Sequence, residues 1–172
     1  MTFFNWLKKQ SPQGPQDTAI VHKLKQAFPQ HPEDKLGLLG AMAGLMAWVA
    51  YVDMEITQEE IQAMEKALQQ FSHLTQEEAE CVTKIACEDM RQLSGIDNHH
   101  YCEPLATNLS EAERFGILKT LFAIAASDGE ASNYESEEIR TISKGLLLST
   151  EQFIQARASV IEYLGVIKMK RG

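Results

Sequence analysis

Apolar residues recur along most of this chain at the three- and four-residue steps of amphipathic helices. After Thr57, for example, Ile61, Met64, Leu68 and Phe71 fall on one helical face. Later segments show the same spacing, and none shows sustained alternation with a period of two. The pattern therefore predicts an all-α protein without β-strands.

Helix starts are marked by capping boxes, in which a Ser or Thr caps free amides and a Glu or Gln three residues later reaches back. The boxes are Thr57–Glu60, Thr75–Glu78, Ser110–Glu113 and Ser149–Gln152. With the apolar spacing, they predict a compact bundle of seven to eight helices. These helices are expected near residues 17–28, 33–53, 57–72, 75–93, 97–106, 110–127, 134–147 and 149–169.

One apolar segment, residues 36–52, carries no charge for 17 residues, which is the lower limit for crossing a bilayer. Gly40 and Gly44 form a G-x-x-x-G pair, which lets helices approach closely. However, the segment is rich in Gly and Ala, and the acidic residues Asp53 and Glu55 follow it closely. We therefore expect a buried central helix of a water-soluble core rather than a membrane helix.

The amino terminus differs from the rest of the chain. Residues 1–9 combine aromatic residues with two lysines, which favours a short amphipathic helix, and residues 11–16 form a Pro- and Gly-containing linker. Such a helix either packs back on the domain or touches a membrane surface. We expect residues 1–16 to precede a single helical domain over 17–172, since this length suits one domain.

The formal net charge of −8 disfavours binding to nucleic acid or to anionic membranes. The three cysteines, Cys81, Cys87 and Cys102, form no C-x-x-C pair, so a reducing cytoplasm is the expected compartment, with membrane contact only through residues 1–9. His99, His100 and Cys102 are candidate zinc ligands, but adjacent histidines diverge on a helix, and we expect a polar surface segment there.

Both halves of the chain place an Asp-x-Glu element after an apolar helix and a Glu-Glu-Ile sequence shortly afterwards. The elements are Asp53-Met54-Glu55 with Glu59-Glu60-Ile61, and Asp128-Gly129-Glu130 with Glu137-Glu138-Ile139. Aligning the two Glu-Glu-Ile sequences makes the second turn three residues longer. The pattern predicts an internal two-fold repeat of helices.

The sequence Ala-Ala-Ser-Asp-Gly-Glu at 125–130, with its downstream Glu-Glu-Ile, resembles the signature of the TerB-like tellurite-resistance family. The same family includes the amino-terminal domain of a DnaJ-like membrane co-chaperone, and the resemblance covers roughly residues 34–165. It implies an all-helical bundle with a two-fold repeat whose acidic residues bind a divalent metal. By resemblance, the metal candidates are Asp53, Glu55, Glu60, Asp128, Glu130 and Glu138.

Clustered carboxylates from two adjacent turns suit a hard cation such as Ca²⁺, Mg²⁺ or Mn²⁺. The spacing is not that of an EF-hand, because Asn133 and Ile139 occupy the sixth and twelfth positions counted from Asp128. Alternatively, the acids only cap backbone amides and helix starts. Met54 is expected to resist the positive φ that Gly129 permits, which makes the second element the better ion candidate.

These patterns favour a non-enzymatic, stress-associated helical module that binds a partner protein and a divalent ion at its acidic turns. The association with tellurite resistance comes from the resemblance alone. One alternative is a metal-dependent hydrolase that uses the same carboxylates, and another is a membrane-peripheral adaptor held by residues 1–9. The oligomeric state and the identity of the partner stay open.

Overall fold

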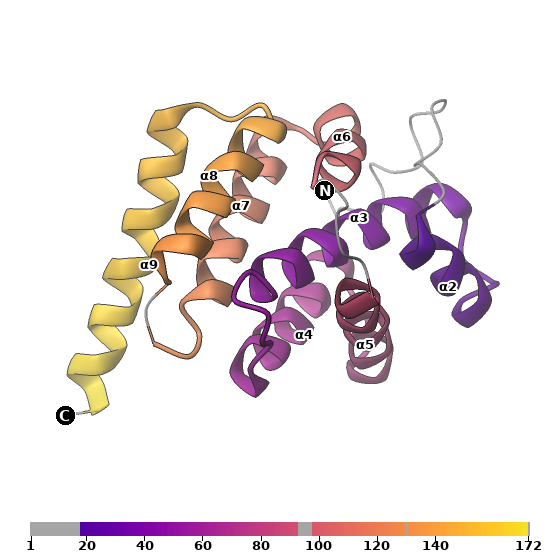
Figure 1. Cartoon of the computed structure of the whole chain (residues 1–172), viewed down its shortest axis with the longest axis horizontal. Coiled ribbons are helices and arrows are strands. Elements are labelled where there is room, and N and C mark those ends of the chain that lie inside the picture. Colours follow the sequence, from indigo (N-terminus) through magenta and orange to yellow (C-terminus); the bar gives the residue numbers. More distant parts are fainter. Residues whose placement is uncertain (1–17, 93–97, 130, 172) are drawn as a thin grey trace.

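The computed structural model describes residues 18–92, 98–129 and 131–171, and this part of the chain forms helices and no strands (Figure 1). The predicted all-α class is therefore confirmed, and each helix begins and ends within three residues of its predicted bounds. The helices are α2 Ala19–Ala27, α3 Glu33–Ala50, α4 Gln58–Ser72, α5 Gln76–Gln92, α6 His99–Asn108, α7 Glu111–Ala125, α8 Asn133–Gly145 and α9 Thr150–Arg171. The segment predicted over 1–16 lies outside the described residues.

The helix starts follow the capping chemistry predicted from the sequence. All four expected boxes are present, as at Thr57, whose Oγ1 accepts from the Glu60 amide while Glu60 Oε2 accepts from the Thr57 amide. A fifth box, between Ser132 and Glu135, was not predicted. Each box satisfies amides that the first helical turn leaves without an intrahelical partner.

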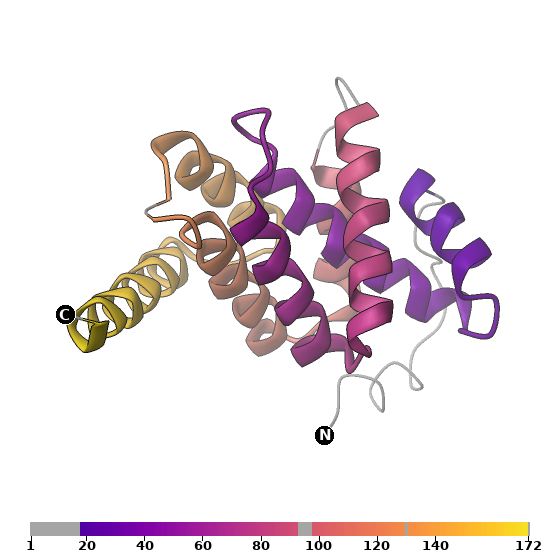
Figure 2. The same cartoon turned by 90° about the horizontal axis from the view of Figure 1, so that it is seen from below.

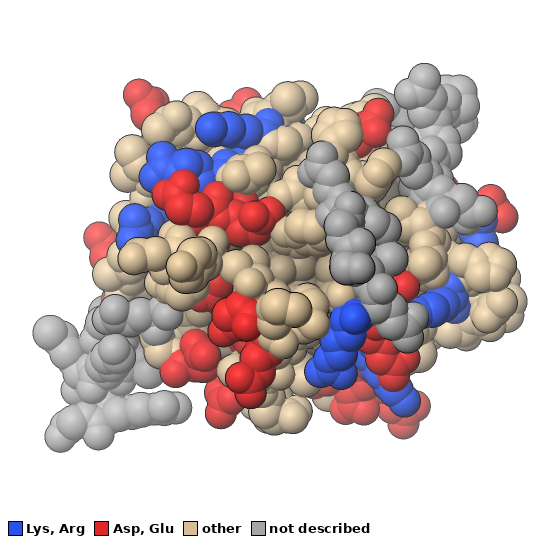
Figure 3. All heavy atoms as spheres, viewed as in Figure 1, with Lys and Arg blue, Asp and Glu red and all other residues tan. Residues whose placement is uncertain are grey.

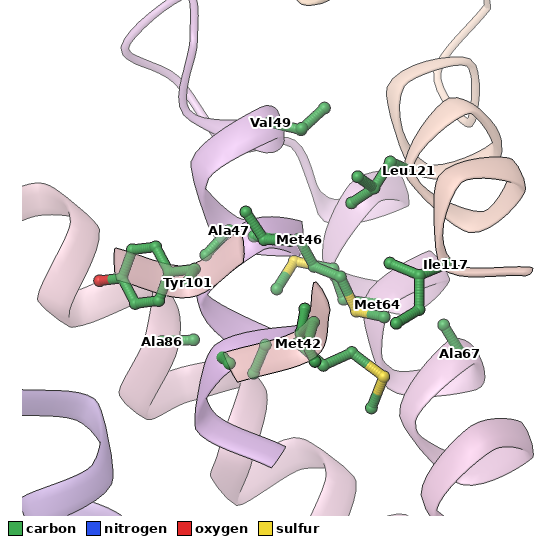
Figure 4. Close-up of a cluster of buried hydrophobic side chains, with 14 of the residues drawn as sticks. Met42, Met46, Ala47, Val49, Met64, Ala67, Ala86, Tyr101, Ile117 and Leu121 are labelled. Carbon is green, nitrogen blue, oxygen red and sulfur yellow. The ribbon is translucent and has the colours of Figure 1, made fainter. Parts of the chain in front are cut away.

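Helix α3 is the centre of the bundle, because 14 of its 18 residues are buried. It contacts α2, α4, α5, α6, α7 and α8. In Figure 4, Met42 and Met46 of α3 lie between Tyr101 of α6 on one side and Met64 and Ile117 on the other. The predicted buried central helix is confirmed, and within the described ranges no helix is both long and apolar enough to span a membrane.

Six of the described helices form a two-fold repeat of a three-helix unit. The unit α3–α4–α5 recurs as α7–α8–α9, with α5 packed on α3 and α9 packed on α7. Each first helix also contacts the second helix of the other unit, so that α4 lies against α7 and α8 against α3. The two other helices, α2 and α6, break this symmetry: α2 packs on α3 and α5, and α6 on α3 and α8. Figures 1 and 2 show α2 and α9 at opposite ends of the bundle.

Candidate functional site

The two acidic turns connect α3 to α4 and α7 to α8, and both begin with an equivalent backbone hydrogen bond. Helices α3 and α7 end at Ala50 and Ala125, which are 75 residues apart. Beyond them, the Met54 amide donates to the Tyr51 carbonyl at 2.9 Å, and the Gly129 amide donates to the Ala126 carbonyl at 3.2 Å. Figures 1 and 2 place the two turns on the same side of the bundle.

The register of the repeat differs from the one predicted. Thr57 and Ser132 are the N-caps of α4 and α8, and their boxes close on Glu60 and Glu135 respectively. Ser132 follows Thr57 by 75 residues, and Glu135 follows Glu60 by the same number. The second turn is therefore not three residues longer than the first. The counterpart of Glu60 is therefore Glu135 and not Glu138.

Glu60 and Glu135 are buried carboxylates, with 3% and 8% of their surface exposed. Glu60 Oε2 accepts hydrogen bonds from the Thr57 amide at 2.8 Å and from Thr57 Oγ1 at 2.9 Å. Burial nevertheless raises the pKa of Glu60 to about 6, and the negative charges of Glu135 and Asp128 raise it further against these hydrogen bonds. Carboxylates of both repeats thus act on one another at this site.

Glu60 is expected to make the free energy of unfolding fall as the pH rises from 4.5 to about 6. Between these values the folded chain binds more protons than the unfolded chain, so the contribution is present below pH 4.5 and lost above pH 6. The shift corresponds to at most about 2 kcal/mol. Urea unfolding at pH 4.5 and pH 7, without divalent ions, measures this change in the free energy of unfolding. Glu60→Gln is the control, because its side chain does not ionise. Parallel pH dependences in the two proteins would show that Glu60 is not shifted.

The other predicted ligands lie nearer the surface. Asp53, Glu55 and Asp128 are exposed, and Glu130 lies outside the described residues. Asp53 Oδ1 accepts a hydrogen bond from the Glu55 amide at 3.1 Å, as expected for an acid that caps its own turn. Acidic side chains gather in Figure 3 around the region in which these turns lie in Figure 1. Capping and cation binding are compatible there, since a carboxylate has four lone-pair sites.

Met54 does not behave as predicted. Its φ is 68°, in the left-handed region that was expected to exclude it, and its side chain is 75% exposed. This conformation costs a residue with a Cβ roughly 1–2 kcal/mol. The turn imposes it because the chain must leave α3 and reach the Thr57 cap within a few residues. Gly129, at the equivalent position of the second turn, has a φ of 157°, so the two turns differ in backbone angle at this residue.

Glu138 lies three residues beyond Glu135 on α8 and has different hydrogen-bond partners. Its Oε1 accepts hydrogen bonds from Trp48 Nε1 at 2.7 Å and from Asn98 Nδ2 at 2.5 Å. These bonds tie α8 to α3 and to the start of α6. Glu138 also lines a cavity of about 250 Å³ together with Trp48, Tyr51, Val52 and Met90. As a metal ligand Glu138 stays a prediction, and its observed contacts are structural.

Within the described ranges, no group of three or more His, Cys, Asp or Glu side chains is arranged to hold a metal ion. This includes the segment at the start of α6, where Cys102 is buried while His99 and His100 are exposed. At the acidic turns, the sequence analysis missed one buried acid, Glu135. Its signal was present as Ser132-Asn-Tyr-Glu135, the same capping box as Thr57 to Glu60.

Comparison with known proteins agrees with this architecture. Residues 39–158 match the family model described as tellurite resistance protein TerB. The match spans more than half of the chain and includes both acidic turns and helices α4 to α8 in full. No curated protein and no solved structure matched the chain. The expected resemblance is thus confirmed, and the chain belongs to the TerB tellurite-resistance family.

Proposed function

We propose that this chain is a non-enzymatic TerB-type module that binds a divalent cation at its paired acidic turns and acts by binding a partner protein. The observation that carries the cation proposal is the pair of equivalent acidic turns on one side of the bundle, each with a buried carboxylate, Glu60 or Glu135, at the start of the next helix. Carboxylates that repel one another are stabilised when a cation lies between them. The association with chemical stress follows from the family alone.

The geometry favours a cation that keeps part of its water shell. The described carboxylates do not form a complete set of protein ligands, and Glu60 and Glu135 also hold their own helix caps. Mg²⁺ commonly binds through one or two carboxylates and several waters. We therefore assign the inner contacts to Asp128 and Glu60, with Asp53 and Glu135 supplying charge around them.

Thermal unfolding in EDTA and in millimolar Mg²⁺, Ca²⁺ or Mn²⁺ tests this assignment. At a cation concentration about 100 times the Kd, linkage stabilises the folded chain by roughly 2.7 kcal/mol, which raises the Tm by roughly 5–10 °C. Asp128→Asn is expected to remove most of this rise and Asp53→Asn part of it. Both substitutions keep the size of the side chain and its ability to accept a hydrogen bond.

Glu77→Gln is the matched control, because Glu77 is an exposed acid in the first turn of α5, away from both acidic turns. This variant loses one negative charge, as Asp128→Asn does, and should keep the full response. Equal responses in the two variants would mean that the ions only screen the net charge. No response to any of the three ions would refute the cation proposal.

A further inference from the structure

Helix α6 fills a groove between α3 and α8. Its Tyr101 ring packs against Gly44 of α3, where an added Cβ would lie 2.5 Å from Tyr101 Cε1. Its Cys102 packs against Gly145 of α8, where an added Cβ would lie 2.8 Å from Cys102 Sγ. Asn98, at the start of α6, is hydrogen bonded to Glu138 of α8. The two glycines therefore make room for a helix that is not part of the repeated unit.

The repeat places an equivalent groove between α7 and α4. Moving 75 residues along the chain takes Trp48 of α3 to Ala123 of α7. The same step relates Ala63, Ala67 and Gln70 of α4 to three positions of α8 that contact α6. Those positions are Glu138, Ile142 and Gly145, whose contacts with α6 are the Glu138 hydrogen bond, the Ile142 carbonyl beside Cys102 Sγ, and the close packing at Gly145.

This second groove is open, with a volume of about 770 Å³. All four counterpart residues line it: Ala63, Ala67 and Gln70 from α4 and Ala123 from α7. The alanines are small, so an incoming helix can approach closely over them, whereas Gln70 stands where the first groove has Gly145. The bundle therefore repeats the groove but not the helix that fills it.

We propose that the α4–α7 groove binds an amphipathic, basic helix of a partner protein in the way that the α3–α8 groove binds α6. The volume of the groove and the small alanine side chains that line it favour a helix that presents small or medium apolar side chains. Helix α6 has 10 residues, or about 15 Å of helix, which sets the length needed. This inference deepens the partner-binding part of the proposed function and does not depend on the cation.

Charge decides between a foreign helix and a second copy of this chain. Glu59 and Glu65 line the groove with one cation, Lys66, and Ser127 at its end precedes the acidic Asp128. The whole chain carries a formal charge of −8, so two copies repel one another. A basic helix is attracted to both the groove and its acidic end, which favours a partner with Lys or Arg on its polar face.

The test uses the full chain labelled with ¹⁵N, in buffer with EDTA, and a synthetic helical peptide with Ala and Leu on one face and Lys on the other. Saturable shifts are expected at the amides of Ala63, Ala67 and Ala123, and a scrambled peptide of the same composition should bind more weakly. Ala123→Trp puts a large ring into the space that the incoming helix would occupy. It is expected to weaken binding by at least about tenfold.

Ala112→Trp is the matched control, because Ala112 is also an exposed alanine of α7 but does not line the groove. It should leave the affinity unchanged, and Gln62→Trp, at another groove residue, should repeat the effect of Ala123→Trp. Equal binding of the scrambled peptide, or shifts centred on the exposed Ile154 and Ile161 of α9, would overturn the proposal. Two further results would overturn it, because the occupant would then belong to this chain. One is a dimer of the parent chain that dissociates on Ala123→Trp, and the other is a change of the groove amide signals on Trp6→Ser in the absence of peptide.

EDTA removes divalent ions, so the peptide titration does not involve the cation site. A peptide that does not bind would therefore contradict the groove proposal alone and not the cation proposal. In the same way, a chain that ignores Mg²⁺ can still bind the peptide. The two results together separate the groove from the acidic turns.

Discussion

Replacing Gly44 with alanine is expected to destabilise the folded chain by about 1–3 kcal/mol, although alanine is the better helix former. The new Cβ would lie 2.5 Å from Cε1 and 2.6 Å from Cδ1 of the Tyr101 ring. That ring is only 2% exposed, so it cannot move aside without opening the contact between α3 and α6. Urea unfolding measures the loss directly.

Gly116→Ala is the matched control, because Gly116 also lies inside a helix, in α7. A Cβ there would meet its nearest atom, Phe71 Cε1, at 3.5 Å, which is an ordinary contact. The helix propensity of alanine should then stabilise the chain by up to about 1 kcal/mol. If both substitutions changed the stability alike, α6 would not pack against α3 as described.

Glu138→Ala is expected to cost about 2–3 kcal/mol, because it removes the acceptor shared by Trp48 Nε1 and Asn98 Nδ2. The change should leave the cation response intact, since Glu138 faces α3 and α6 in this structure. Urea unfolding gives the first quantity, and the rise in Tm with Mg²⁺ gives the second.

Glu137→Ala provides the comparison for Glu138. Glu137 is its neighbour, 72% exposed, and its carboxylate lies 3.5 Å from the Arg140 guanidinium. An exposed pair of this kind contributes little, so the stability should stay within about 0.5 kcal/mol of the parent chain. A Glu138→Ala variant that keeps its stability and loses the cation response would instead make Glu138 a ligand.

The sequence predicted the helices because their signals are local. A capping residue such as Thr57 and the apolar face that follows it lie within one segment of chain, so helix bounds follow without knowledge of the packing. The uncharged segment that became α3 was predicted to be buried for a similar reason. Its glycines were expected to allow close packing, which occurs at Gly40 against Val21 and at Gly44 against Tyr101.

The predicted register between the two acidic turns was wrong for an identifiable reason. The identical Glu-Glu-Ile sequences ending at Ile61 and Ile139 were aligned, although in α8 this sequence lies one turn later than in α4. The capping box aligns Glu60 with Glu135, because the cap fixes where each helix begins. Backbone geometry was therefore a better guide than the likeness of short sequences.

Long-range packing was not predictable from these patterns. Helix α6 follows α5 and precedes α7 along the chain, yet it packs between α3 and α8. Its position depends on Gly44 and Gly145, which are 101 residues apart and form no joint motif. The open groove between α4 and α7 becomes apparent only when the two repeats are compared in three dimensions.

Paramagnetic broadening by Mn²⁺ tests most directly whether the two acidic turns form one cation site. Trace Mn²⁺ is added to the ¹⁵N-labelled chain, and the loss of each amide signal reports how close that amide lies to the ion. We expect residues 53–60 and 128–135 to broaden together, and Asp128→Asn to reduce the effect in both. Broadening confined to one turn, or centred elsewhere on the acidic surface, would contradict a shared site.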